Sequence, residues 1–375
     1  MRKFSLLILL IFICETTLFG TDQINNSRQN AITRASASAS KAVVGINVTE
    51  VKRVFYNRPS YFNDDIFSRF FHRYQKRRRV KEYEVKGLGS GFIISSDGYI
   101  LTNHHVAGRA KKVVITMSGG KKYDAEIIGS DMTSDIALLK IDAKNLPYLK
   151  FSSEDAIIGE WAIALGNPFG LFDNNAKPTV TVGVVSNTGV NFVHTESGNI
   201  QVYRNMIQTD AAISSGNSGG PLVNAQGELI GMNTLIYSTS NSGSGTGSIG
   251  IGFSIPVSRI NSIIKKLKLG KELRRDYYTG LEVRELNEKL SQRLGIPKQD
   301  GVIVYGINKR SPSDIAGLEP GDLIIKIDDK KIIDEEDFLL EINDHFVGDR
   351  LEFLILRADE TLKKKMILIP PPKRR

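Results

Sequence analysis

The feature that most constrains this chain is a succession of short apolar runs, separated by turn residues, that begins at Gly87. Two of the turns are hairpin signals, because Asp97-Gly98 and Gly119-Gly120 each lie between runs of strand-forming residues. The same pattern continues through "IALLKI", "WAIALG", "TVTVGVVS", "ELIGMNTLI" and "IGFSIPV", at intervals that are typical of an all-β barrel or sandwich. We therefore expect a mainly β domain, which begins with a strand at "AVVGINV".

A helical pattern marks the end of this domain. Four apolar residues have the spacing of one helix face and precede Gly270: Ile260, Ile263, Ile264 and Leu267. Beyond them, short strands such as "GVIVYGI" and "DLIIKID" alternate with a helical "DEEDFLLEIN", whose acidic start suits a helix N-terminus. The sequence thus predicts a β domain over residues 42–270 and a small α+β domain over residues 278–372, and 375 residues suffice for two cores.

The N-terminus has the composition of a secretory signal, which we expect to occupy residues 1–20. Two basic residues precede an apolar run from Phe4 to Cys14, which is shorter than the roughly 20 residues needed to span a bilayer. A lipoprotein signal ending at Cys14 is the alternative, although Ile13 stands where a small residue is expected. The Ser/Ala-rich residues 21–41 are expected to be mobile. The mature protein is accordingly expected in the periplasm or otherwise outside the cytoplasm.

Cysteine and histidine usage excludes several kinds of site. Cys14 is the only cysteine, so a chain without its signal has no thiol nucleophile, no disulfide and no cysteine ligand for zinc. No two of the five histidines have the i, i+4 spacing of an H-E-x-x-H zinc motif. We therefore expect neither a metal ion nor another cofactor.

The net charge of +9 is spread along the chain. Its basic stretches, such as "HRYQKRRRVK" and "KKLK", are scattered between elements and are not interleaved with aromatic residues on one face, so we expect solvated surface and no nucleic-acid binding. A weak association with anionic membrane surfaces is compatible with this charge. The long segment at residues 52–85 has no sustained periodicity, which favours a regulatory loop or an assembly surface.

The stretch "AAISSGNSGGPLV" places one serine, Ser218, among glycines between two apolar segments. Such a stretch alone is an ordinary turn, because a serine hydroxyl is a weak nucleophile until an oriented base takes its proton. A histidine and an acid occur upstream, in "TNHHV" and in "SDIALLKI". The order histidine, aspartate, serine is the one that this catalytic constellation takes on the double β-barrel fold.

These motifs, together with "LGNPFG", resemble those of the HtrA/Deg family of envelope serine proteases. "YTGLEV" and "SPSDIAGLEPGDLI" resemble the PDZ domain that follows the protease in that family. The resemblance covers roughly residues 42–370 and implies a trypsin-like double six-stranded β-barrel followed by one α+β PDZ domain. The loop at residues 237–250 is longer and richer in glycine and serine than the family pattern, and only one PDZ-like domain follows.

Two histidines and two aspartates compete for the catalytic roles. The family pattern T-N-x-H-V implies that His105 is the base, and neighbouring strand residues point to opposite faces, so His104 would face away from Ser218. The family pattern likewise implies Asp135 as the acid, whereas Asp131 is the better turn former. We therefore expect a triad of His105, Asp135 and Ser218.

The glycines around Ser218 suit an oxyanion hole, because Gly216 can present its backbone N–H beside that of Ser218. The resemblance implies a substrate pocket without charge, which favours cleavage after small or medium aliphatic residues. The residues expected to line this pocket are Ile213, Gly250, Ile251 and Gly252.

The "YTGL" loop is expected to bind the C-terminal carboxylate of a peptide through successive backbone N–H groups, while the peptide adds as a strand beside "LEV". An ordinary turn is the alternative for this loop. The residues of this predicted site are Tyr278, Thr279, Gly280 and Leu281.

The resemblance thus implies a serine endopeptidase that cleaves unfolded or damaged envelope proteins in protein quality control and the stress response. It also implies a homotrimer built through the protease domains. The alternative function is a binding protein, either a catalytically silent chaperone or a PDZ adaptor that keeps the fold. Retention of all three triad residues argues against that alternative.

Overall fold

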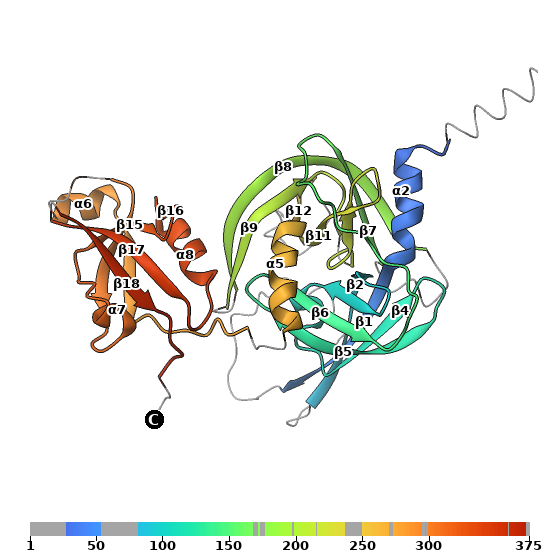
Figure 1. The fold of residues 1–375 in the computed structure, drawn as a ribbon, viewed down its shortest axis with the longest axis horizontal. Helices are drawn as coiled ribbons and strands as arrows, with labels where there is room; N and C mark the ends of the chain where they lie inside the picture. Colours follow the sequence, from blue (N-terminus) through green and yellow to red (C-terminus); the bar gives the residue numbers. More distant parts are fainter. Residues whose placement is uncertain are drawn as a thin grey trace, which may run out of the picture. The chain divides into compact units, whose positions relative to one another are not determined.

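The computed structural model describes residues 28–53, 82–167, 172, 177–196, 199–214, 216–236, 250–269, 273–294, 297, 299–358 and 360–372. Its strands form two closed barrels and a separate open sheet (Figure 1). The mainly β architecture expected from the sequence is therefore confirmed. The expected signal at residues 1–20 lies outside the described residues, as do most of the segments at 52–85 and 237–250.

The first barrel has the strand order β1-β2-β3-β6-β5-β4. Its strands are β1 (Val43–Arg53), β2 (Glu82–Ile93), β3 (Tyr99–Thr102), β4 (Lys112–Met117), β5 (Lys122–Asp131) and β6 (Ile136–Ile141). The turn at Asp97-Gly98 joins β2 to β3, and the turn at Gly119-Gly120 joins β4 to β5; all three glycines have positive φ. Both predicted hairpins are confirmed.

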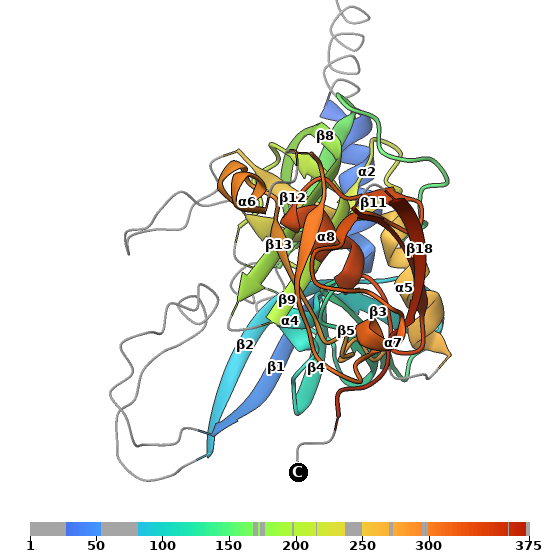
Figure 2. The same cartoon turned by 90° about the vertical axis from the view of Figure 1, so that its left-hand side faces the viewer.

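Strands β1 and β2 form a long antiparallel ribbon, which is clear in Figure 2. Their pairing runs from Val43 opposite Phe92 to Arg53 opposite Glu82. Residues at both ends of the expected loop at 52–85 are therefore strand residues, which corrects the sequence-based boundaries. Pairing across the ribbon gives the backbone N–H and C=O groups of these residues hydrogen-bond partners. The sequence there has no period that predicts a strand.

The second barrel has the strand order β10-β11-β12-β9-β8-β7. Its strands are β7 (Trp161–Gly166), β8 (Thr179–Glu196), β9 (Asn199–Thr209), β10 (Pro221–Val223), β11 (Leu229–Ile236) and β12 (Gly252–Pro256). Small and branched side chains fill its interior, among them Ala162, Ala164, Val185 and Leu222. The predicted helix follows as α5 (Val257–Lys268), whose four predicted apolar residues are all buried.

Helix α2 (Ala31–Ala39) corrects the expectation of a mobile segment at residues 21–41. Asn30 caps the helix, because its side chain accepts a hydrogen bond from the N–H of Thr33 at 3.0 Å. Ala35 and Ala39 are buried, and a short 3₁₀ turn (Ser40–Ala42) leads from the helix into β1. Alanine is the best helix former and lets a helix pack closely, so the Ser/Ala composition that suggested mobility also permits an ordered helix.

The open sheet has the order β13-β14-β15-β17-β18, with β16 paired to β15. Its strands are β13 (Leu281–Glu285), β14 (Val302–Ile307), β15 (Leu323–Ile327), β16 (Lys330–Lys331), β17 (Arg350–Arg357) and β18 (Glu360–Ile367). Its helices are α6 (Glu288–Leu294), α7 (Pro312–Ile315) and α8 (Glu335–Asn343). The predicted α+β domain is thus present, and Asp334 caps α8 by accepting a hydrogen bond from the N–H of Asp337 at 2.9 Å.

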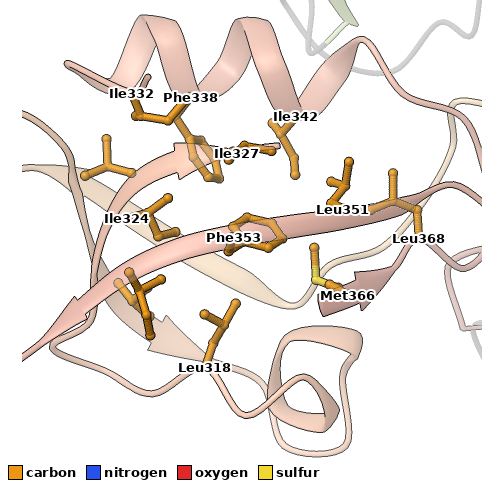
Figure 3. Packing of buried hydrophobic residues seen from close by; sticks show 13 residues of the cluster. Leu318, Ile324, Ile327, Ile332, Phe338, Ile342, Leu351, Phe353, Met366 and Leu368 are labelled. Atoms are coloured by element: carbon orange, nitrogen blue, oxygen red, sulfur yellow. The ribbon is translucent and has the colours of Figure 1, made fainter. Parts of the chain in front are cut away.

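The core of this sheet lies between its strands and α8. Figure 3 shows Phe338 and Ile342 pointing from α8 toward Phe353 and Leu351 of β17. A smaller cluster contains Leu286, Ile303 and Leu323 and is packed by Leu290 of α6. Among all described residues, no helix is both long enough and apolar enough to cross a membrane.

Candidate active site

Ser218 lies on a tight turn that leads into β10. Three backbone hydrogen bonds hold the turn: Asn217 N–H donates to Ser214 O at 2.9 Å, Gly219 N–H to Asn233 O at 2.8 Å, and Gly220 N–H to Asn217 O at 2.9 Å. The Ser218 hydroxyl donates to the carbonyl oxygen of Thr234 at 3.2 Å. Backbone hydrogen bonds therefore hold the turn, and its serine is partly buried.

The glycines of this turn occupy positions that exclude a side chain. Gly219 has φ +81°, and a Cβ atom there would lie 2.3 Å from the carbonyl oxygen of Ser90 and 2.4 Å from the Thr102 hydroxyl. Gly216 also has positive φ, at 100°. The turn accordingly passes directly against the first barrel, beside the residues that precede the two histidines.

Sequence reasoning missed Ser90, which is buried on β2 and bonded to the same turn. Its N–H donates to Ser218 O at 3.1 Å, and its hydroxyl donates to Gly216 O. The hydroxyl also accepts from the N–H of Asn167 at 2.7 Å. The signal in the sequence was a serine between two glycines in "GLGSGF", which is too common in turns to single out.

His104 and His105 lie on a single helical turn, α4 (His104–Ala107), and not on a strand. The argument from alternating strand faces is therefore wrong, because β3 ends at Thr102. The His104 ring lies against Gly108, where a Cβ atom would be 2.1 Å from its Nδ1. Successive helix residues point about 100° apart, so the two rings still face different surroundings.

Asp135 is completely buried and stands immediately before β6. It adopts a left-handed conformation with φ 57°, which is uncommon for a residue other than glycine and accompanies special positions such as active sites. Strand β6 is the neighbour of β3 in the first barrel, and β3 leads into α4. The barrel thus brings the elements that carry the histidines and Asp135 side by side.

Asp131 is the last residue of β5 and not part of the turn at residues 132–135 that precedes β6, which corrects the expectation of a turn former. Its carboxylate accepts a hydrogen bond from the Ser134 hydroxyl at 2.6 Å and forms an ion pair with Arg275 at 2.9 Å. Both carboxylate oxygens contact Arg275, since Nε lies 3.0 Å from the second oxygen. Both carboxylate oxygens of Asp131 are therefore bonded to structural partners.

The residues expected to line the substrate pocket lie close together. Ile213 is fully buried, and a Cβ atom at Gly252 would lie 2.8 Å from its Cδ1. Ile251 is half-buried, and Gly250 is exposed with φ 83°. The Ile213 side chain thus covers the backbone at the start of β12.

The "YTGL" loop precedes the edge strand β13. Tyr278 N–H donates to Ile369 O at 2.8 Å, and the loop carbonyl oxygens are held, because Thr279 O accepts from Ser313 and Gly280 O from Asn308 N–H. Within the described part of the chain, no hydrogen bond is recorded for the N–H groups of Thr279 and Gly280. A loop with fixed carbonyls and two such donors is a suitable anion site.

No group of three or more histidine, cysteine, aspartate or glutamate side chains is arranged to hold a metal ion within the residues that the structure describes. The donors at the site are backbone N–H groups, a hydroxyl and imidazoles. Such a set suits acyl transfer, in which charge develops on a carbonyl oxygen.

Comparison with known proteins matches two parts of the chain to family models. Residues 89–232 match the trypsin-like peptidase domain, and residues 277–368 match the PDZ domain. The first match covers the histidines, Asp135 and Ser218, and the second covers the "YTGL" loop.

Curated relatives are periplasmic proteases by name. The chain is 41% identical over 318 residues to the probable periplasmic serine endoprotease DegP-like of Chlamydia trachomatis, covering 83% of this chain and 60% of that protein. It is 37% identical over 326 residues to the protein of the same name from Buchnera aphidicola, covering 86% and 65%. The chain thus spans about 60% of the length of the curated relatives it matches.

Solved structures match over nearly the whole chain. The HtrA-type protease AlgW with decapeptide superimposes with a TM-score of 0.66 at 34% identity, covering 91% of this chain and 99% of that one. The serine endoprotease from Yersinia pestis gives a TM-score of 0.60 at 28% identity, covering 91% and 98%. The two barrels, the sheet that follows them and these relatives together place the chain in the HtrA family, in which a trypsin-like peptidase domain is followed by a PDZ domain.

Proposed function

We propose that this chain is an exported serine endopeptidase that cleaves unfolded or damaged polypeptides in protein quality control and the stress response. The observation that carries the proposal is the glycine turn that holds Ser218 against the residues just before the histidines. The names of the relatives support an endoprotease of the periplasm. A signal at residues 1–20 would direct the export.

In the proposed reaction, His105 removes the proton of the Ser218 hydroxyl as the oxygen attacks the substrate carbonyl. Asp135 holds the imidazole in one tautomer and stabilises its protonated form. The N–H groups of Gly216 and Ser218 stabilise the oxyanion, each contributing roughly 3 kcal/mol. His105 then protonates the leaving amine, and water hydrolyses the acyl-enzyme by the same route.

One rearrangement is required before the first step. The Ser218 hydroxyl donates to Thr234 O at 3.2 Å, so its proton points toward the backbone of β11. Rotation of the hydroxyl about the Cβ–Oγ bond of Ser218 breaks one modest hydrogen bond, worth about 1 kcal/mol, and directs the proton toward an imidazole. The resting serine is thus separated from its reactive position by a side-chain rotation.

The rival function, a silent chaperone or PDZ adaptor, requires no nucleophile. A binding protein gains nothing from the left-handed Asp135 or from a turn too tight for any side chain at Gly219. Both features suit a site in which three groups must meet in one geometry. These two features therefore favour a protease over a binding protein.

The pocket residues support a preference for aliphatic side chains. No charged residue lies at Ile213 or in the segment from Gly250 to Pro256, and burial of an unpaired Lys or Arg there costs several kcal/mol. Small or medium aliphatic residues are normally buried in folded proteins. This preference therefore directs the enzyme to unfolded chains.

We also place a peptide site at the edge strand β13. The N–H groups of Thr279 and Gly280 receive the terminal carboxylate, and the peptide pairs with β13 as an added strand. Half-buried apolar side chains next to the core provide a floor for its last residue, namely Leu281, Val283 and Leu339. The partners of this site are polypeptides with a free, apolar C-terminus.

A homotrimer is the proposed assembly, with contacts between protease domains. Trp161 at the start of β7 is 48% exposed, although tryptophan is costly to leave in water. Because Trp161 pairs with Val184, Val182 and Val180 project from the same face, and both are exposed. Further exposed apolar residues precede Trp161 in the chain, at Ile157 and Ile158.

The triad is tested by three substitutions. Ser218→Ala and His105→Ala should each reduce cleavage of a denatured protein below about a thousandth of the parent rate, as in comparable triads. His104→Ala should retain most activity, and Ser218→Ala should still bind unfolded chains. Equal melting temperatures control for folding. Loss of activity in His104→Ala with retention in His105→Ala would reverse the assignment, and equal activity in Ser218→Ala would exclude the proposed enzyme.

Cleavage should follow Val, Ala, Ile and residues of similar size, with only modest discrimination between them because one methylene is worth about 1–3 kcal/mol. Mass spectrometry of the fragments of a denatured protein, digested by the parent and by Ser218→Ala, identifies the cut sites that depend on the enzyme. A majority of cuts after Lys or Arg would contradict the uncharged pocket.

The peptide site is tested with one peptide in two forms, ending in valine with either a free carboxylate or an amide. The acid form should bind with micromolar-range affinity, about −8 kcal/mol. The amide should bind at least tenfold more weakly, because it lacks the charge that the loop N–H groups receive. Calorimetry measures both, with a scrambled acid peptide ending in aspartate as control. Equal affinities would remove the carboxylate site.

The assembly is tested by Trp161→Glu, which places a charge on the exposed apolar face. Light scattering should report a trimer for the parent and a monomer for the variant. Tyr148→Glu is the matched control, because Tyr148 is an equally exposed aromatic residue, at 49%, in another segment. A monomeric parent would refute the trimer, and a trimeric Trp161→Glu would exclude this face from the contact.

A further inference from the structure

Ser90 holds the two residues that carry the proposed oxyanion donors. Its hydroxyl donates to the carbonyl oxygen of Gly216, and its N–H donates to the carbonyl oxygen of Ser218 at 3.1 Å. Asn217 lies between these two anchored carbonyls. One residue of β2 therefore fixes the turn on both sides of the Asn217–Ser218 peptide.

The Ser90 hydroxyl is itself fixed. It accepts a hydrogen bond from the N–H of Asn167 at 2.7 Å, so its own proton is directed toward Gly216. The Ser90 carbonyl oxygen accepts from the Thr102 hydroxyl at 2.7 Å. Ser90 is completely buried, and each of these polar groups has a protein partner. The network leaves the hydroxyl one orientation in which every group is satisfied.

Gly216 is a residue whose N–H needs such a restraint. Glycine has access to both signs of φ, and Gly216 stands at φ 100°. Without a partner for its carbonyl oxygen, its two flanking peptide planes can rotate and turn the N–H away from a bound substrate. With the carbonyl held by Ser90, the peptide plane that follows Gly216 is fixed, and only rotation about the two backbone bonds of Gly216 itself can still turn its N–H.

We infer that Ser90 is a positioning residue that keeps the N–H groups of Gly216 and Ser218 aimed at the oxyanion, an inference that rests on the proposed protease function. It contacts no substrate. Its hydroxyl acts through the Gly216 carbonyl, and its effect is greatest in the transition state, where the negative charge develops.

The test compares Ser90→Ala with Thr102→Val. The first removes the hydroxyl that holds Gly216, and the second removes a neighbouring buried hydroxyl of the same network but leaves that hold intact. Ser90→Ala should lower kcat roughly 10- to 100-fold, a part of the loss seen when a whole oxyanion donor is removed. KM for a short peptide substrate should stay within about twofold, and Thr102→Val should keep kcat within about threefold.

A peptide aldehyde adds a readout that a loss of stability would not produce. It forms a hemiacetal with the nucleophile and places an oxygen in the oxyanion hole, so Ser90→Ala should weaken its inhibition by about the same factor as kcat. A rise in KM that accompanies the fall in kcat, or equal losses of kcat in both variants at equal melting temperatures, would reduce Ser90 to a structural residue.

Hydrogen exchange tests the anchoring without any activity. The N–H groups of Asn217, Gly219 and Gly220 are hydrogen-bonded in the turn, and in Ser90→Ala their exchange should accelerate at least tenfold, against little change in Thr102→Val. Unchanged exchange in Ser90→Ala would overturn the inference whatever the activity. If the parent cleaves no denatured protein, the proposed function fails, and the exchange rates still decide whether Ser90 restrains the turn.

Discussion

The structure of the site depends on the close approach of one glycine to the first barrel. At Gly219, any side chain would collide with the Ser90 carbonyl and the Thr102 hydroxyl. This approach brings the serine turn of the second barrel next to the segment that leads into α4. The geometry of the site follows from the contact between barrels, because neither barrel by itself carries both the serine and the histidines.

A second constraint comes from buried polar groups. Asp135, Asn167, Asn233 and Ser90 are all buried, and buried polar groups are costly unless they are paired. Asn233 illustrates the solution, since its side chain donates to Pro221 O at 3.2 Å and accepts from the Ser254 hydroxyl at 2.9 Å. Polar residues that would weaken an ordinary core here fix the loops that surround the nucleophile. The same hydrogen bonds that stabilise the fold also define the site.

Much of the fold could be predicted from the sequence where local signals agreed. Asp97-Gly98 and Gly119-Gly120 specify hairpins by turn chemistry, and the apolar face of α5 and the Asp334 cap of α8 follow from periodicity and capping. The incorrect predictions concern segments whose structure depends on packing against residues far away in the sequence. The segment "TNHHV" was predicted to be a strand, but it forms helix α4 after Thr102. The Ser/Ala-rich segment was predicted to be mobile, but it forms α2, in which Ala35 and Ala39 are buried. Ser90 could not be found, since the turn residues that it bonds lie more than a hundred positions away in the chain, with a separation of 126 residues to Gly216.

The hydrogen bonds between Ser90 and the serine turn also affect when the site can form during synthesis. Strand β2 is synthesised well before residue 218, and the turn can be anchored only after its own residues and Asn233 of β11 have been made. A chain synthesised only as far as β9 therefore contains His104, His105 and Asp135 but not Ser218. The order of residues along the chain thus makes the serine turn the last part of the site to form.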